Sequence, residues 1–421
     1  GELFGLLNMR DNELVGMSEE LGALAAGVMN EFNRIHNENV ASPPPNTLTG
    51  LNTGTLSTDP HNFTGQSTFA VTDNNGNLVN SVTIDFGVTG PNFSDVLTAV
   101  NTALAGNGSL ALTNGALSFT ATNASHGVSI SQVAGSESDR AGKGFSHYFG
   151  MNDLIDARSS GRFETGVVGT DAHGFNGGDT VHMEIKGLGG INLASYTMTM
   201  TGGQSFNDII TDLNASSLGS YTTFSLSATG ELISTPNTGF DYARVHVKTD
   251  TTTRGTSGKT FSDYFGIGNR YLVDAAFDFG VTQRISDNVN GLSLAKFDDT
   301  ALVGETAISF GDQRGGIALQ ELENENVSLR KAGGLSAFNS TIGQYAAAVL
   351  ADFGFRAQLS EGFGEDSNIL LDELNQRTQS ISGVNVDEEL SNMIVFQNAY
   401  SSSARMLSVA QDLFDEILGI V

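Results

Sequence analysis

The sequence of 421 residues contains no cysteine. This absence excludes disulfide bonds, thiolate metal sites and cysteine nucleophiles. It suits either a cytosolic protein or a protein that is exported unfolded, by a route that disulfides would obstruct.

Basic residues are also scarce: 20 Lys and Arg stand against 47 Asp and Glu, which gives a formal charge of -27. Such a charge repels phosphate backbones and anionic lipid headgroups, so we expect neither nucleic acid nor a membrane as a partner. No stretch approaches the roughly eighteen apolar residues of a membrane span, and the first ten residues lack the pattern of a cleavable signal.

The remaining composition predicts several β-rich domains. Charged residues make up 16% of the chain, and 51 glycines accompany many Thr, Ser and Asn residues, which favour turns and short strands. A chain of this length exceeds what one hydrophobic core usually organises, so we expect two to four domains.

Apolar residues at three- and four-residue steps predict an amphipathic helix within residues 1–40. We expect it to end before Ser42-Pro43-Pro44-Pro45, because proline removes an amide donor and disfavours helix in the preceding residue. Residues 41–65 are then interpreted as a linker. The predicted apolar face consists of Leu14, Met17, Leu21, Leu24, Val28, Phe32 and Ile35.

The middle of the chain contains a duplication. Alternating strand patterns and turns such as Asn75-Gly76 surround a helical stretch at 93–100, and the same order returns later. The clearest match pairs Gly142-Lys143-Gly-Phe145-Ser-His-Tyr-Phe-Gly150 with Gly258-Lys259-Thr-Phe261-Ser-Asp-Tyr-Phe-Gly266. We interpret residues 66–157 and 180–275 as two globular modules joined by a linker at 158–179, and the aromatic block as core rather than a binding motif.

Helical periodicity returns toward the end. Residues 276–316 are expected to be irregular or β, and 317–382 to be helical, with a break at Glu361-Gly-Phe-Gly364 and an end at Ser382-Gly383. The predicted fold is therefore multidomain α+β: a discontinuous helical bundle or coiled-coil domain from the two chain ends, with the two β-rich modules inserted. The apolar face of this second helical region is predicted to contain Leu335, Phe338, Ile342, Tyr345, Val349, Phe353 and Leu359.

The last segment, 383–421, has the pattern of an assembly helix. Asn385 or Asp387 can cap it, and Glu388 and Glu389 suit the positive end of the helix dipole. A seven-residue apolar period predicts a coiled-coil or bundle seam, although packing on its own domain is the alternative. The predicted seam comprises Leu390, Met393, Phe396, Tyr400, Ala404, Leu407, Ala410, Phe414, Ile417, Leu418 and Val421.

A search for chemistry predicts no catalytic, cofactor or metal site, and hence no enzyme. The Asp73 loop lacks the downstream glutamate of a calcium loop, and Gly258-Lys259-Thr260 lacks the upstream glycine of a phosphate-binding loop, which is Thr253 here. Two histidines nine residues apart, His173 and His182, have the closest spacing among His36, His61, His126, His147, His173, His182 and His246.

The letters of the last segment resemble the C-terminal signature of the flagellar rod, hook and hook-associated family, and are most similar to its hook–filament junction branch. The stretch Gly5-Leu-Leu-Asn-Met-Arg10-Asp11 and the return after Gly311-Asp312 are similar to the same branch, so the resemblance covers roughly the first 40 and last 110 residues. The signature positions are Ser382, Gly383, Val384, Asn385, Asp387, Glu388, Glu389, Gln397, Tyr400 and Arg405.

The resemblance implies a structural subunit that joins hook to filament. Its terminal helices would self-associate in a ring or tube, with the β modules outward. Hook protein, a second hook-associated junction protein and an export chaperone would be its partners. The chain would be secreted through the flagellar export channel. The family's N-terminal helical segment does not precede residue 1, so the sequence is either truncated or an unusual form, and we expect its last helix to need another segment or subunit. An extracellular glycan- or surface-binding adhesin and a hook or distal-rod subunit remain alternatives.

Overall fold

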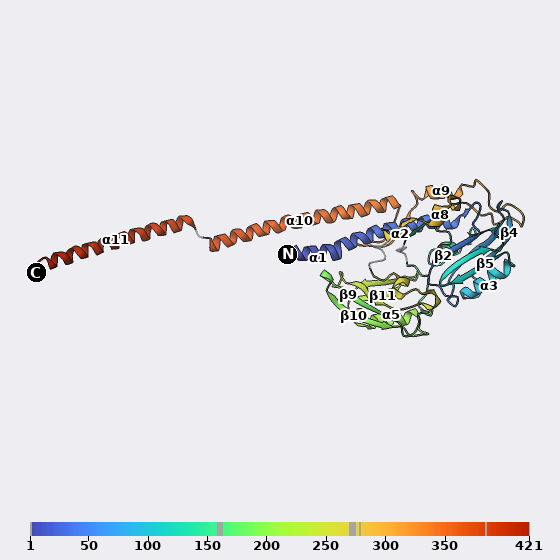
Figure 1. The fold of residues 1–421 in the computed structure, drawn as a ribbon, viewed down its shortest axis with the longest axis horizontal. Coiled ribbons are helices and arrows are strands. Elements are labelled where there is room, and N and C mark those ends of the chain that lie inside the picture. Colours follow the sequence, from blue (N-terminus) through green and yellow to red (C-terminus); the bar gives the residue numbers. More distant parts are fainter. Residues whose placement is uncertain (1, 158–162, 269–274, 278, 384, 421) are drawn as a thin grey trace. The chain divides into compact units, whose positions relative to one another are not determined.

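The computed structural model describes residues 2–157, 163–268, 275–277, 279–383 and 385–420. The chain forms two compact units, Gly1–Asp352 and Phe353–Val421 (Figure 1). Mixed helices and small antiparallel sheets make up the first unit, which agrees with the predicted α+β class. Among the described residues, no helix combines the length and hydropathy that crossing a bilayer requires.

The N-terminal helix is confirmed, but its buried face differs from the predicted one. It comprises α1 (Glu2–Asn8), the π-helical turn η1 (Met9–Glu13) and α2 (Leu14–Glu38). Leu14 and Leu21, two residues of the predicted apolar face, are exposed. Small and polar residues are buried instead, because the chain packs close to the helix backbone: a Cβ on Gly27 would meet the side chain of Leu329. The buried residues of α2 are Gly16, Glu19, Glu20, Gly22, Ala23, Ala25, Ala26, Gly27, Met29, Glu31, Asn33, Ile35, His36 and Asn37.

Copy 1 of the duplicated module packs two three-stranded sheets, in the orders β4-β3-β7 and β2-β6-β5, with two helices. Asn92 caps the first helix in a capping box, and Asn114 and Gly115, both with positive φ, form the β5–β6 turn. The elements are β2 (Thr47–Asn52), β3 (Gln66–Thr72), β4 (Leu78–Asp85), α3 (Phe93–Ala103), β5 (Gly108–Thr113), β6 (Ala116–Ala121), β7 (Gly127–Gln132) and α4 (Phe145–Phe149).

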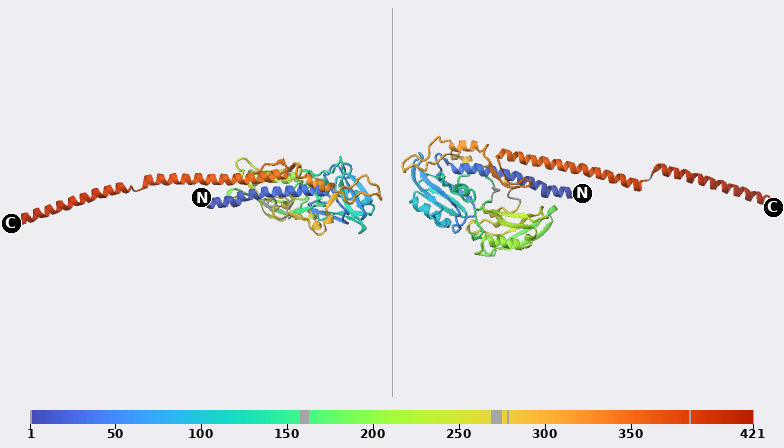
Figure 2. Two further views of the ribbon diagram at one scale, coloured as in Figure 1. Left: turned by 90° about the horizontal axis from the view of Figure 1, so that it is seen from above. Right: turned by 180° about the vertical axis from the view of Figure 1, so that it is seen from behind.

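Copy 2 repeats this order, as predicted. Sheet β10-β9-β13 corresponds to β4-β3-β7, and β11 pairs with β12 as β5 does with β6. Figure 2 shows the copies as two separate lobes along α2. The elements are β9 (Thr180–Lys186), η2 (Leu188–Gly190), β10 (Asn192–Thr199), α5 (Phe206–Ala215), η3 (Ser217–Ser220), β11 (Thr222–Leu226), β12 (Leu232–Pro236), β13 (Arg244–Asp250), η4 (Gly255–Ser257) and α6 (Phe261–Phe265).

The aromatic block is core in both copies. Phe145 and Phe149 are at most 1% exposed, and Phe261 and Phe265 at most 3%. Each block ends at a glycine with positive φ, Gly150 in copy 1, which closes the helix in the left-handed region. The interpretation as a core plug and turn is therefore confirmed.

Two segments that the sequence analysis interpreted as linkers belong to the modules. Strand β2 lies within 41–65 and pairs with β6. Residues 53–63 (arm 1) and 165–175 (arm 2) share the pattern Thr-Gly-x-x-x-Thr-Asp-x-His-x-Phe, and each arm ends in a buried phenylalanine, Phe63 or Phe175. Both linker assignments were wrong here, because a lone buried aromatic in a polar stretch gives little periodic signal. Residues 158–162 of the second predicted linker lie outside the described residues.

The flanking elements close the first unit. The predicted helix from 335 is wrong at its start, because Phe338 belongs to a hairpin that precedes the helix. The pairs are β1-β15, β8-β14 and β16-β17. The elements are β1 (Val40–Ala41), β8 (Ile155–Ala157), β14 (Phe279–Val281), α8 (Gln283–Asp287), η5 (Val289–Gly291), β15 (Ser293–Ala295), α9 (Arg314–Glu321), β16 (Val327–Leu329) and β17 (Phe338–Ser340).

Two long helices complete the chain, α10 (Ile342–Ser382) and α11 (Val386–Leu418). The start of α10 belongs to the first unit, where Tyr345 is fully buried and its ring lies 5.4 Å from that of Phe338. The predicted break at 361–364 is wrong: α10 continues through Gly362 and Gly364. A glycine in a helix interior costs only about 1 kcal/mol relative to alanine, and the hydrogen bonds of a 41-residue helix outweigh that cost.

Candidate functional site

Helix α11 begins as the sequence predicts. The side chain of Asn385 accepts a hydrogen bond from the Asp387 amide, so Asn385 is the cap. The first turn carries Asp387, Glu388 and Glu389, whose charges favour the positive end of the helix dipole. Of the other signature residues, Ser382 ends α10 and Gly383 follows it, while Gln397, Tyr400 and Arg405 lie on α11. Val384 falls outside the described residues.

The predicted seam residues are exposed along the whole of α11. Phe396 and Tyr400 are 72% and 77% exposed, and Phe414 is 68% exposed. Val421 lies outside the described residues. The remaining exposed seam side chains are Leu390, Met393, Ala404, Leu407, Ala410, Ile417 and Leu418.

Apolar side chains cover a wider arc of α11 than the predicted seam. Met406, Val409 and Leu413 are 54 to 77% exposed. At 100° per residue they form a second stripe beside the seam, so the distal half of α11 is apolar over about half of its circumference. A single partner helix covers a narrower stripe, so this half has room for contacts with two. Sequence reasoning missed the second stripe because it followed the seven-residue period alone.

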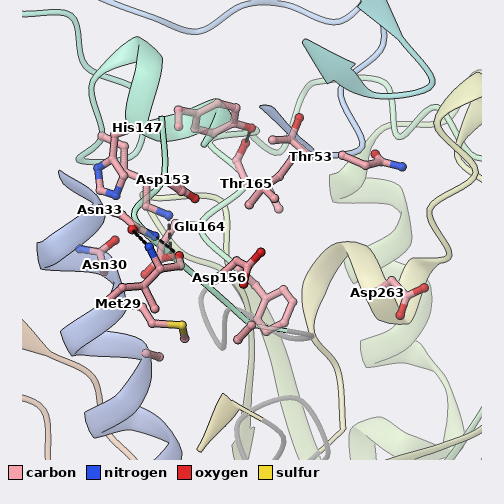
Figure 3. Close-up of a pocket in the computed structure, with 18 of the residues that line it drawn as sticks. Met29, Asn30, Asn33, Thr53, His147, Asp153, Asp156, Glu164, Thr165 and Asp263 are labelled. Atoms are coloured by element: carbon pink, nitrogen blue, oxygen red, sulfur yellow. Dashed lines mark hydrogen bonds and ion pairs between the residues drawn. The ribbon is translucent and has the colours of Figure 1, made fainter. Parts of the chain in front are cut away.

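A cavity of about 410 Å³ lies in the first unit between α2 and the two copies (Figure 3). Asp153 and His147 line it from copy 1, and Asp263 lies across it on α6. Its hydroxyl groups serve structural bonds: Tyr148 Oη donates to Thr165 O at 2.6 Å, and Thr165 Oγ1 donates to Gly230 O at 2.6 Å. The cavity therefore lies at a junction between the modules, where Tyr148 of copy 1 bonds to arm 2.

Two buried arginines hold this junction together. Arg140 donates to His61 O of its own copy and to Thr165 O of arm 2, at 3.0 and 2.9 Å. Arg254 donates to His173 O of its own copy at 2.9 Å and to Gly54 O of arm 1 at 2.6 Å. Each arginine therefore binds one backbone carbonyl in each arm.

Arg254 also forms a buried ion pair. Its guanidinium lies 2.8 Å from an Asp59 carboxylate oxygen and 4.7 Å from the centre of the Tyr264 ring. Arg140 lies 4.5 Å from the Tyr148 ring centre in the equivalent position. Removing either partner of such a pair leaves an uncompensated charge, so the pairing fixes the two copies against each other.

A buried polar cluster, which we name the flank network, joins three segments that are distant in sequence: the end of α2, residues 152–155 and the return at 282–293. Asn37 Nδ2 donates to Asp153 Oδ1 at 2.7 Å, and the Asn152 side chain donates to His36 O and Ser293 Oγ. The Ser293 amide donates to His36 Nε2 at 2.8 Å, so Nδ1 carries the hydrogen and donates to Asn152 O. These bonds close the first unit at the base of the modules.

Burial shifts the pKa values of two groups of the flank network, Asp153 and His36, in opposite directions. Loss of water raises the pKa of the Asp153 carboxyl to about 7, although the Asn37 hydrogen bond opposes this. Loss of water lowers the pKa of the His36 imidazole to about 4. Near neutral pH His36 is therefore uncharged, and Asp153 is partly protonated.

The histidines do not gather into a metal site. His173 Nε2 contacts Thr201 O at 2.8 Å, whereas His182 lies on β9 beside Thr197. Across the part of the chain that the structure describes, no three His, Asp or Glu side chains are grouped so that they could hold a metal ion. The Asp73 loop is the β3–β4 turn, in which Asp73 accepts hydrogen bonds from the Asn75 and Asn77 amides.

The long C-terminal helices are similar in sequence to those of known flagellar proteins. Residues 375–420, which include the end of α10 and all of α11, match the family model described as flagellar basal body rod FlgEFG protein C-terminal. Flagellar hook-associated protein 1 of Escherichia coli K12 is 30% identical over 139 residues, 32% of this chain and 24% of the relative. The predicted resemblance to flagellar axial proteins is confirmed.

Two further relatives carry the same name. Flagellar hook-associated protein 1 of Salmonella typhimurium is 30% identical over 131 residues, 31% of this chain and 22% of the relative. The Bacillus subtilis protein is 32% identical over 74 residues, 18% of this chain and 15% of the relative. The alignments span about a quarter or less of the length of these hook-associated proteins.

Proposed function

We propose that this chain is a structural, non-catalytic subunit of the bacterial flagellum, at the junction between hook and filament. The main support is the exposed apolar surface of α11. The segment that carries this surface matches the rod-family C-terminal model, and part of the chain is similar to hook-associated protein 1. An exposed apolar stripe of this length is a surface for partner helices.

The mechanism is geometric. Helix α11 packs with the same helix of neighbouring subunits into a ring or tube, and the duplicated modules project from it. Hook protein and a second hook-associated protein bind its two ends, and an export chaperone covers α11 before secretion to the cell exterior. A chain without cysteine reaches this location unfolded without forming disulfides.

The test compares two double variants of the full-length gene in its own organism. Phe396→Asp with Tyr400→Asp places charges on the seam, where burial of each aromatic contributes roughly 2 kcal/mol. We expect loss of filament attachment and of swimming. Ser401→Asp with Ser408→Asp places the same charges on the polar side of α11 and should leave both intact.

Normal swimming of the seam variant would contradict the proposal. Localisation separates the junction from a hook or distal-rod role: a fluorescently labelled chain should mark a single point at the hook tip. Labelling along the whole hook would instead support the hook subunit.

A further inference from the structure

The duplication gives two versions of one sheet face. In copy 1, the face of β4-β3-β7 that points away from the module core carries small uncharged residues, and those on β3 and β7 are at most 8% exposed. The end of α2 packs against β7 and residues 297–307 pack against β3; Ala307, for example, packs on Ala70. The covered residues are Thr68, Ala70, Thr72, Ser129 and Ser131.

In copy 2 the equivalent face carries charges. Val181, Met183 and Ile185 point into the core, so the alternate residues of β9 point outward, and the same holds for β13. The Lys248 and Arg244 side chains are 61% and 36% exposed. We name this surface the outer face of copy 2; it consists of His182, Glu184, Lys186, Arg244, His246 and Lys248.

Positive charge dominates the outer face. Lys186 Nζ, Lys248 Nζ and His182 Nε2 lie 2.6, 3.4 and 3.7 Å from the carboxylate of Glu184, so one acidic group faces three cationic or protonatable ones. Arg244 pairs with Glu19 of α2. A local excess of basic side chains is notable in a chain whose formal charge is -27.

Helix α10 carries the complementary pattern. Glu361, Glu365 and Asp372 fall within about 40° of one another around the helix axis and are exposed. The exposed side chains of Phe363 and Leu370 lie on the opposite side. If the apolar side packs against other helices, the acidic side is left to face a different surface.

We propose that the outer face of copy 2 docks the acidic side of α10 from a neighbouring copy of this chain. The inference rests on the proposed function, because it requires subunits that assemble side by side. Copy 1 provides the geometric precedent, since the end of α2 already packs against β7, one strand of the equivalent sheet. The opposite charges of the two surfaces select the partner and its register.

Zero-length carbodiimide cross-linking tests the contact directly. The full chain is prepared with natural and with 15N nitrogen, mixed, allowed to assemble and cross-linked. We expect mixed-isotope peptides that join Lys186 or Lys248 to Glu361, Glu365 or Asp372. An intrachain cross-link of Lys248 to Glu184 is expected in any case, because the two side chains are 3.4 Å apart. The proposal would be overturned if all cross-links of these lysines were confined to single-isotope peptides, or if the mixed-isotope peptides joined them only to other segments.

Charge-reversal variants test how much the docking contact contributes to self-association. Lys186→Glu with Lys248→Glu should weaken self-association in sedimentation velocity by roughly tenfold at low salt, and by little at high salt. Adding Glu361→Lys, Glu365→Lys and Asp372→Lys should restore it. The control Lys331→Glu changes an exposed lysine elsewhere, and circular dichroism checks that each variant is folded.

The two proposals fail in different ways. If the α11 seam variant abolishes assembly while the Lys186 and Lys248 reversal behaves like the Lys331 control, the docking contact is refuted and the proposed function stands. If the seam variant assembles normally, the proposed function fails. Weakened association of the lysine reversal that the acidic reversal does not restore also refutes the docking contact.

Discussion

Asp153→Asn should change how the stability of the first unit depends on pH. The unfolded chain releases the Asp153 proton near pH 3.8, whereas the folded protein holds it to about pH 7. Stability from this group is therefore complete below pH 3.8 and is lost as pH rises to 7. The difference corresponds to about 4 kcal/mol, at about 1.4 kcal/mol for each pH unit.

His36 acts in the opposite direction. Its pKa falls from 6.5 to about 4 on folding, so the unfolded chain binds a proton that the folded protein rejects. Stability from His36 is present above pH 6.5 and is lost as pH falls to 4. Between pH 4 and 6.5 the two slopes oppose each other, and we expect their joint contribution in the unmodified protein to be nearly flat.

Two variants separate these contributions while retaining hydrogen bonds. Asn at 153 still accepts from Asn37, and Gln at 36 donates to Asn152 O and accepts from the Ser293 amide. Urea unfolding from pH 4.5 to 7.5 should show Asp153→Asn gaining stability with rising pH relative to the unmodified protein, and His36→Gln losing it. Pairwise differences that stay constant with pH would refute the reasoning, because both groups would then titrate alike in the folded and unfolded states.

Three further predictions concern other parts of the chain. Arg254→Ala should cost about 3 to 5 kcal/mol in urea unfolding, because it leaves Asp59 buried without its cation; loss below 1 kcal/mol would contradict this. Gly362→Ala with Gly364→Ala should slow hydrogen exchange in the middle of α10, since each glycine costs about 1 kcal/mol in a helix interior, whereas unchanged exchange would favour a break there. Asn385→Ala should cost about 1 kcal/mol and speed exchange in the first turn of α11 but not at its end.

Local patterns in the sequence predicted the elements well where side chains alternate or recur. The turn at Asn75-Gly76, the helix that begins at Phe93 and the capped start of α11 follow from residue chemistry within a few positions. The duplication was predicted from the aromatic blocks, but its true start was missed, although the shared Thr-Gly-x-x-x-Thr-Asp pattern of the two arms was visible.

What could not be predicted depends on contacts between distant segments. The buried side of α2 contains Glu20 and His36 because Gly334 supplies a hydrogen bond to the first, and Asn152 and Ser293 supply hydrogen bonds to the second. No local period encodes those partners. The reciprocal binding of Arg140 and Arg254 to both arms likewise requires knowing how the copies meet. The seam of α11 was predictable because its period is local, and its second stripe, which has three- and four-residue spacing, was equally visible but was missed because only the seven-residue period was followed.

The flank network has a consequence for how such chains can change in length. It holds the end of α2 next to the return at 282–293, so the point where the chain enters the modules and the point where it returns from them lie side by side. The distance between the two flanking segments is then set by the flank network and not by the modules inserted between them. Whole modules can be gained or lost there, as the duplication suggests has happened, while the spacing of the flanking segments stays the same.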